Sequence, residues 1–176
     1  MTAMAPHSPS ELRKLVFELV PDEDDYPPVA SEAIWGIRLG PSEYRLDNTP
    51  WYVYGASKGD VVTAVARDGE LIAKCVVRQG GHSTLRVYAE GDARKAKVVR
   101  EITRRGGVCS VSSKCSLFAV DIPPDVAFAA IDDYLSGAVE DGEVEYEDAC
   151  LQHPGIDRER VLECLSLPTL ADIVAK

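Results

Sequence analysis

The stretch Gly80-Gly81-His82-Ser83-Thr84-Leu85-Arg86 divides the chain into two halves with different sequence patterns. Before it, short β-forming runs alternate with turn residues, which is typical of an all-β unit. After it, the pattern reads strand, helix, strand, strand, helix, strand, the βαββαβ order of ferredoxin-like folds. The sequence therefore predicts an α+β protein with two units, and we interpret the two glycines as a flexible join between them.

The clearest element before the junction is a hairpin over Val61–Val76. Asp68-Gly69 supplies the positive backbone angles that a two-residue type I′ turn requires. The pairs counted outward from that turn are Ala66 with Leu71, Ala64 with Ala73, and Val62 with Cys75. Further short strands are predicted over Lys14–Val20, Ala33–Leu39 and Tyr44–Leu46. Because each is too short to bury itself, we expect a small β-barrel-like unit of SH3-like or OB-like type.

The half after the junction is predicted to form four strands and two helices. The strands are Thr84–Ala89, Val108–Val111, Cys115–Ile122 and Val144–Leu151. The first helix begins with Asp92 as its cap, buries Ala96, Val99 and Ile102, and ends at Gly106-Gly107. The second helix opens after Pro123-Pro124-Asp125 and buries Phe128, Ile131 and Leu135. Short helices are also expected over Asp157–Leu165 and Leu170–Ala175.

These patterns divide the chain into four parts. Residues 1–10 are expected to be a disordered leader, residues 11–80 a β-barrel-like unit, residues 81–152 a ferredoxin-like βαββαβ unit, and residues 153–176 a helical tail.

The chain is acidic, with a formal net charge of -10 from 29 acidic and 19 basic side chains. Such a surface repels phosphate backbones and anionic lipids, so neither nucleic acid nor a membrane is the expected partner. No long apolar run and no signal peptide is visible, which favours a cytoplasmic protein. The five cysteines form no C-x-x-C pair, and we interpret them as reduced thiols.

The sequence offers few residues that are suited to catalysis or to metal binding. Cys109, Cys115, Cys150 and His153 could bind zinc, but the 4-1-3-2 strand order of a ferredoxin-like sheet separates Cys109 from Cys150 by roughly 14 Å. His82 and Ser83 are neighbours on a strand, so their side chains point to opposite faces and cannot form a base and nucleophile pair. No phosphate-binding glycine motif occurs. We therefore expect no metal and no cofactor.

A binding surface is the alternative that the residues favour. Trp51 follows Asp47-Asn48 in an aromatic-rich segment, and strand alternation places Thr84, Arg86 and Tyr88 on one face that could be open. Arg86 there would suit a carboxylate or phosphate. The candidate binding residues are Asp47, Asn48, Trp51, His82, Ser83, Thr84 and Arg86.

Several separate sequence blocks together resemble a bacterial domain-of-unknown-function family, of the DUF4265 type. The blocks are Tyr26-Pro27-Pro28, the strand around Trp35, Tyr44 to Trp51, Gly59-Asp60-Val61-Val62, and Gly81 to Val87. The resemblance spans Leu15 to Leu151 and implies that Asn48, Pro50, Asp60, Ser83, Thr84 and Arg86 belong to the family's motif blocks. It implies no activity.

Two classes of function stay open at this point. The first is a non-catalytic binding or regulatory protein, comparable to an immunity protein or an accessory factor, that recognises a protein or small-molecule partner. The charge suits a basic protein as that partner. The alternative is a small enzyme with its site in a cleft between the units, around His82, Ser83, Thr84 and Arg86. An assembly role is third, and the oligomeric state, including a dimer, is left open.

Overall fold

The computed structural model describes residues 11–166, which form an α+β protein with two sheets and three helices. The predicted leader, residues 1–10, and the predicted helix Leu170–Ala175 lie outside the described residues. Within the described part, no helix has both the length and the apolar character needed to cross a bilayer.

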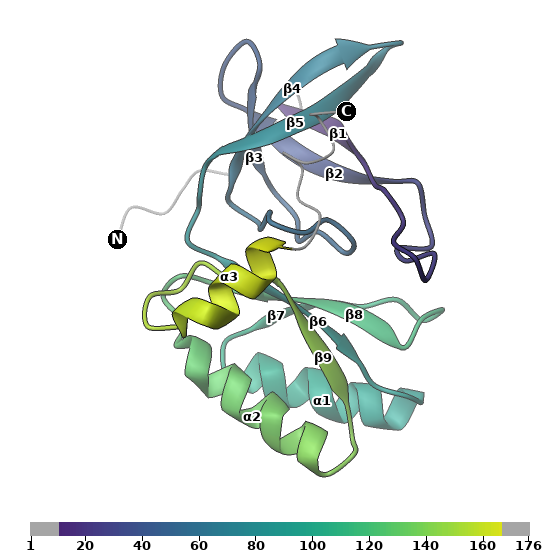
Figure 1. Ribbon diagram of the computed structural model, residues 1–176, viewed down its shortest axis with the longest axis vertical. Helices are drawn as coiled ribbons and strands as arrows, with labels where there is room; N and C mark the ends of the chain where they lie inside the picture. Colours follow the sequence, from purple (N-terminus) through teal and green to yellow (C-terminus); the bar gives the residue numbers. More distant parts are fainter. Residues whose placement is uncertain (1–10, 167–176) are drawn as a thin grey trace.

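The first sheet closes on itself. Its strands are β1 (Leu12–Glu18), β2 (Ser31–Arg38), β3 (Glu43–Leu46), β4 (Val61–Arg67) and β5 (Glu70–Arg78). They pair antiparallel in chain order, and β5 then pairs parallel with β1, which completes a closed barrel (Figure 1). Leu15, Phe17 and Ile34 have no exposed surface and lie in the core of this barrel. Closure leaves no free edge in this sheet.

The β4–β5 hairpin confirms the predicted turn and corrects the predicted register. Asp68 and Gly69 have φ values of 53° and 85°, as a type I′ turn requires. Two of the three predicted pairs are found, Ala66 with Leu71 and Ala64 with Ala73. The third is wrong, because Val62 pairs with Val76 and Cys75 pairs with Thr63. A register shift beside Thr63 adds one residue to β5, which counting from the turn cannot detect.

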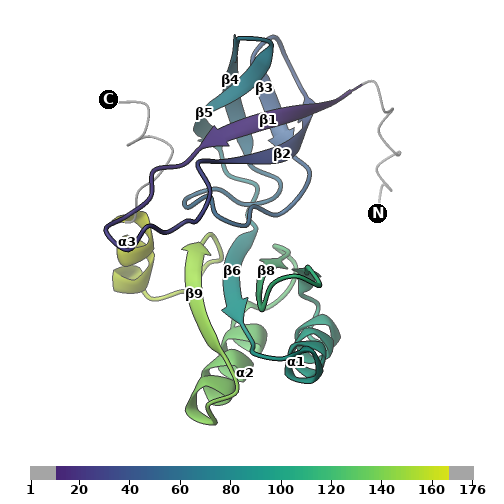
Figure 2. The ribbon, with the colours of Figure 1, turned by 90° about the vertical axis from the view of Figure 1, so that its right-hand side faces the viewer.

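The second sheet has the strand order β7-β8-β6-β9. Its elements are β6 (Ser83–Tyr88), α1 (Asp92–Arg104), β7 (Val108–Ser110), β8 (Leu117–Ile122), α2 (Phe128–Glu140) and β9 (Glu145–Cys150). All its neighbouring strands are antiparallel. Helices α1 and α2 lie on the side away from the barrel (Figure 2). Helix α3 (Arg158–Ser166) follows β9 and contacts it.

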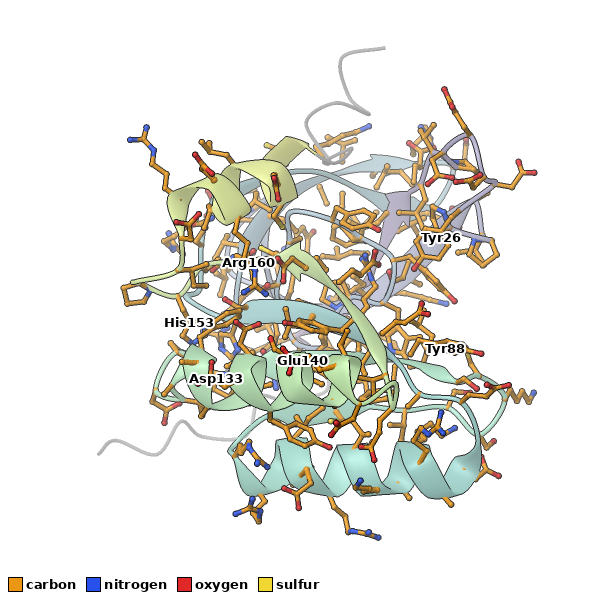
Figure 3. The ribbon with its side chains drawn as sticks, turned by 60° about the horizontal axis from the view of Figure 1, so that its bottom comes forward. Tyr26, Tyr88, Asp133, Glu140, His153 and Arg160 are labelled. Carbon is orange, nitrogen blue, oxygen red and sulfur yellow. The ribbon has the colours of Figure 1, made fainter. Side chains whose placement is uncertain are left out.

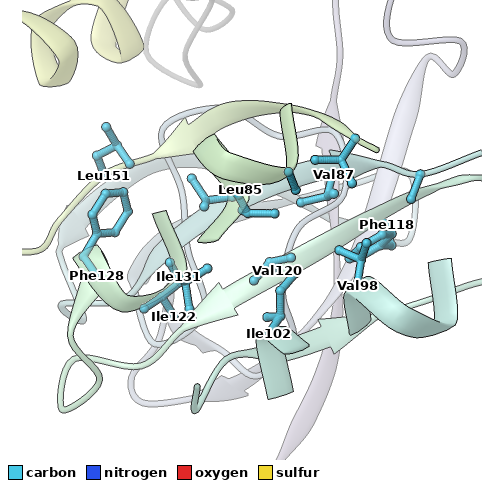
Figure 4. Packing of buried hydrophobic residues seen from close by; sticks show 14 of the residues in the cluster. Leu85, Val87, Val98, Ile102, Phe118, Val120, Ile122, Phe128, Ile131 and Leu151 are labelled. Atoms are coloured by element: carbon cyan, nitrogen blue, oxygen red, sulfur yellow. The ribbon is translucent and has the colours of Figure 1, made fainter. Parts of the chain in front are cut away.

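The core between this sheet and its helices is apolar (Figure 4). Phe128, Ile131 and Leu135 on α2 are buried, as predicted. On α1 the predicted inner face is partly wrong, since Val98 and Ile102 are buried and Ala96 is exposed. Periodicity in so short and charged a helix leaves the rotation uncertain by one position, and packing against the sheet decides it.

The opposite face of the second sheet is covered by the barrel. Thr84 and Arg86 are 0% and 1% exposed, so the predicted open polar face is wrong. The chain between β3 and β4 lies over this face, and it is held there by hydrogen bonds from residues of β6. Of the three residues predicted to share this face, Thr84, Arg86 and Tyr88, only Tyr88 at the far end of β6 is exposed.

The junction glycines allow close packing, and the interpretation as a flexible join is wrong. A Cβ on Gly80 would lie 2.5 Å from the carbonyl carbon of Gly59 and 2.6 Å from its oxygen. Gly81 has a φ of +84°, which side-chain-bearing residues rarely adopt. The amide of Gly80 donates to Asp60, and that of Gly81 donates to Gln152. The join between barrel and sheet is therefore fixed on both sides.

Replacing Gly80 tests whether this close approach matters. Gly80→Ala should lower the free energy of unfolding by about 1–3 kcal/mol, because backbone atoms of Gly59 cannot give way as a flexible side chain would. Gly137→Ala, in α2 with nothing within 4 Å, is the matched control and should stabilise by about 0.5–1 kcal/mol. Urea unfolding of both variants measures the difference, and equal effects would contradict the packing role.

Candidate functional site

Arg86 holds the barrel to the second sheet from inside the protein. Its Nε donates to the carbonyl of Trp51, and one terminal nitrogen donates to the carbonyl of Val53 at 2.9 Å. The other terminal nitrogen donates to Glu147 at 3.1 Å, and the guanidinium lies 4.1 Å from the ring centroid of Tyr54. These contacts use all three of its nitrogens and one face of the guanidinium, so Arg86 fixes a loop of the barrel.

Glu32 on β2 holds the other side of the same loop. Its carboxylate accepts hydrogen bonds from the amides of Trp51, Tyr52 and Val53, at 2.7, 2.8 and 3.3 Å. Burial raises the pKa of Glu32, and the three amide donors oppose that rise only in part. The segment Trp51–Val53 thus has its amides bound by an acid of the barrel and two carbonyls bound by Arg86.

A second polar network surrounds Asp60 where the chain passes between the units. Its carboxylate accepts from the amides of Ser57 and Gly80, at 2.9 and 2.7 Å. The side-chain amide of Gln152 donates to both of its oxygens. Burial raises the pKa of Asp60 against these donors. The Ser57 hydroxyl lies 2.7 Å from the Thr84 hydroxyl, which ties Thr84 to the same network.

His82 and Ser83 point apart, as strand alternation predicts, and each has another partner. His82 Nδ1 lies 2.7 Å from the buried carboxylate of Asp121. Ser83 Oγ lies 2.7 Å from Nδ1 of His153, a contact that spans 70 positions of sequence. Ser83 has no exposed surface and its oxygen also accepts from the amide of Gln152. In residues 11–166, Ser83 and Thr84 are therefore buried and line no cleft, which corrects the predicted cleft around these residues.

The remaining predicted residues lie along the β3–β4 connection. Asn48 accepts a hydrogen bond from the amide of Trp35 at 2.7 Å, so its side chain fixes the backbone. The Asp47 side chain is exposed, while its amide donates to the Trp35 carbonyl. Trp51 is half-buried and its ring lies 6.5 Å from that of Tyr52. None of the three hollows described below is lined by these side chains or by His82.

An open pocket lies where the β1–β2 loop reaches the exposed end of the second sheet. We call it the tyrosine pocket; its volume is about 380 Å³ and its lining is Tyr26, Arg86, Tyr88, Leu117, Glu145, Tyr146 and Glu147. Tyr26 and Tyr88 lie at the same end of the molecule in Figure 3. Burial raises the pKa of Tyr26 to about 12, so this phenol stays neutral. Arg86 is the one predicted site residue that lines this pocket.

A second hollow of about 690 Å³ follows the other side of β9. We call it the α3 groove; its lining is Val139, Glu145, Tyr146, Asp148, Asp157, Glu159, Arg160 and Glu163. Arg160 is its one basic residue, and its guanidinium is held by Asp148 and Asp132 at 2.7–2.8 Å. The groove is therefore acidic.

A third hollow of about 680 Å³ lies at the start of α2 and includes Phe128, His153 and Arg160. Two of its polar side chains are already paired, because His153 Nε2 lies 3.0 Å from the Pro123 carbonyl and Arg160 binds two carboxylates. We therefore prefer the tyrosine pocket as the candidate binding site.

Sequence reasoning missed Tyr26, Glu145 and Glu147 as pocket residues. Tyr26-Pro27-Pro28 was one of the blocks that carried the family resemblance, and the alternating acids of β9 were visible as a pattern. Neither signal could show that a loop near residue 26 lies over a strand near residue 146. That contact depends on how barrel and sheet dock.

Comparison with known proteins gives a family and a shared fold. A family model described as a domain of unknown function, DUF4265, matches residues 32–146. A crystal structure of a hypothetical protein from Neisseria gonorrhoeae is similar, with a TM-score of 0.67 and 17% sequence identity over 80% of this chain and 95% of that one. No curated protein matches. At this identity the structural likeness concerns the fold alone.

Removing the Arg86 guanidinium tests its structural role. Arg86→Met should lower the free energy of unfolding by about 2–5 kcal/mol, because two buried carbonyls lose their donors. Arg94→Met, at an exposed position of α1, is the control and should stay within about 0.5 kcal/mol. If urea unfolding shows only a small loss of stability in Arg86→Met, the structural role of Arg86 is wrong.

Glu32 should titrate above its ordinary pKa of 4.5. A raised folded-state pKa means that this carboxyl favours folding below pH 4.5 and that the benefit is lost as the pH rises through the raised value. Carbon-detected NMR of the Glu32 carboxyl measures the midpoint. Glu32→Gln removes this step from the pH dependence of stability, and a midpoint at or below 4.5 would contradict the burial effect.

Proposed function

The chain belongs to the DUF4265 family of domains of unknown function, and from that premise we propose that it is a non-catalytic binding protein for a basic partner. The site is the tyrosine pocket. Within the part of the chain that the structure describes, the polar side chains with catalytic potential at the junction are hydrogen-bonded to other residues. Ser83 and Thr84 are buried, and His82 is 18% exposed on its side chain. These residues stabilise the fold, whereas the tyrosine pocket is open.

The composition of the tyrosine pocket is the observation that carries this proposal. Tyrosine faces and carboxylates together attract a cation, through the ring quadrupole and through charge. Glu147 is 44% exposed on its side chain, and Glu145 is exposed. The one cation in the wall, Arg86, is held by two carbonyls and by Glu147. The pocket therefore favours an ammonium or guanidinium group, from a small molecule or from a protein side chain.

The net charge of -10 supports the same proposal. It increases the rate of encounter with a basic partner and disfavours anionic ones. A basic protein bound by an acidic one is also the arrangement of an immunity protein or accessory factor, and we expect this chain to act so in the cytoplasm.

We also propose that each of the two units is related to a known fold. The five-stranded closed sheet supports a relation to SH3-like or OB-like barrels, and the β7-β8-β6-β9 order supports a ferredoxin-like second unit. Neither likeness by itself carries a function.

A small enzyme is the second candidate, and one contact favours it. Ser83 Oγ and His153 Nδ1 are 2.7 Å apart, within reach for proton transfer. Ser83 is fully buried, however, and its oxygen accepts from two backbone amides, so a substrate carbonyl could not reach it without opening the junction. The geometry thus supports binding over catalysis.

Titration with argininamide tests the cation-binding pocket. We expect chemical-shift changes in Tyr26, Tyr88 and Glu145 by NMR, with a weaker response to citrullinamide, which has nearly the same shape and keeps the α-ammonium group but lacks the guanidinium charge. Tyr88→Leu should weaken argininamide binding about two- to fivefold, the contribution of one exposed cation–π contact.

The matched charge control uses two exposed glutamates. Glu145→Gln should weaken argininamide binding, whereas Glu70→Gln, beside the β4–β5 turn, makes the same charge change outside the pocket and should not. Equal effects of the two variants would mean that general charge and no pocket is responsible.

A further inference from the structure

We propose that an extended basic segment of a protein partner binds by pairing with β9 as an additional strand of the second sheet. This rests on the proposed function and names its mode of binding. An extended segment can add to an exposed strand edge through main-chain hydrogen bonds, while pockets on either side select its alternate side chains.

Strand β9 has the free edge that such pairing needs. Among the strands that the structure describes, it is the last of the sheet and pairs only with β6. The end of β9 is closed, because the amide of Gly55 donates to the carbonyl of Ala149 and α3 lies beside Asp148. In residues 11–166, Glu145–Glu147 make no backbone hydrogen bond other than those within the sheet. Their outer amides and carbonyls are available to a ligand strand.

Hollows flank this open part of β9 on both sides. The tyrosine pocket and the α3 groove share Glu145 and Tyr146, so they meet at the strand. Tyr88 of β6 lines the tyrosine pocket on the barrel side of the sheet, and Val139 of α2 lines the α3 groove on the helix side. Because successive side chains of a strand point to opposite faces, a strand added to β9 would direct alternate residues into the two hollows.

The negative charge of both hollows favours a basic occupant. Both contain glutamates, and the single basic residue in each, Arg86 or Arg160, is already bound by a carboxylate. A second copy of this chain would place β9 against β9, with glutamates opposite glutamates, which is destabilising. A segment rich in arginine and lysine satisfies the acids on both sides, so the occupant is a basic strand of another protein.

The probe is a short acetylated and amidated peptide of alternating arginine and lysine. A second version has the same sequence and charge and carries a methyl group on every backbone amide nitrogen, so neither of its edges can donate to β9. This version should bind about tenfold more weakly than the parent.

Hydrogen exchange on the protein identifies the strand that pairs. Outward amides within Glu145–Glu147 should exchange at least about tenfold more slowly with the parent peptide bound. Strand β7, the opposite edge of the same sheet, is the control and should not change. Protection of β7 in place of β9 would overturn the inference.

The outcomes separate this inference from the proposed function. If argininamide binds the tyrosine pocket but the methylated peptide binds like the parent, the pocket stands and strand pairing is wrong. If β9 gains protection while argininamide fails to bind, strand pairing stands and the cation pocket is wrong. If neither probe binds, both proposals are wrong.

Discussion

The buried guanidinium of Arg86 is the constraint on which the arrangement of the two units depends. It lies on the central strand β6 and binds the carbonyls of Trp51 and Val53, while Glu32 binds the amides of the same segment. A buried charge is tolerated only when its donors are satisfied. The barrel loop therefore has to lie on the sheet, and the docking of barrel and sheet follows from that requirement.

Docking decides which residues remain for a ligand. The loop covers Thr84 and Arg86, while Tyr88 at the end of β6 and the first half of β9 stay exposed. The β1–β2 loop brings Tyr26 over this uncovered region and completes the tyrosine pocket. The same contacts that join the units thus remove the polar junction from solvent and leave an acidic, aromatic hollow at the sheet edge.

The polar residues of the junction form a tight interface. Gly80 lets two backbones approach, Asp60 and Gln152 bind amides on both sides, and the Ser83–His153 pair fixes the chain after β9. Buried hydrogen bonds of this kind have strict geometry, so they specify one docking of the units more than they add net stability.

The sequence alone determined the α+β class, the element order, the Asp68-Gly69 turn and the buried face of α2, because these follow from local conformational preference and hydrophobic period. It also separated His82 from Ser83 by strand alternation. Only the tertiary structure decided the bulge beside Thr63, the burial of Arg86, the Ser83–His153 contact and the tyrosine pocket around Tyr26. Each of these depends on atoms far apart in the chain, whose meeting is fixed by packing and hydrogen bonding between the units and leaves no local pattern in the sequence.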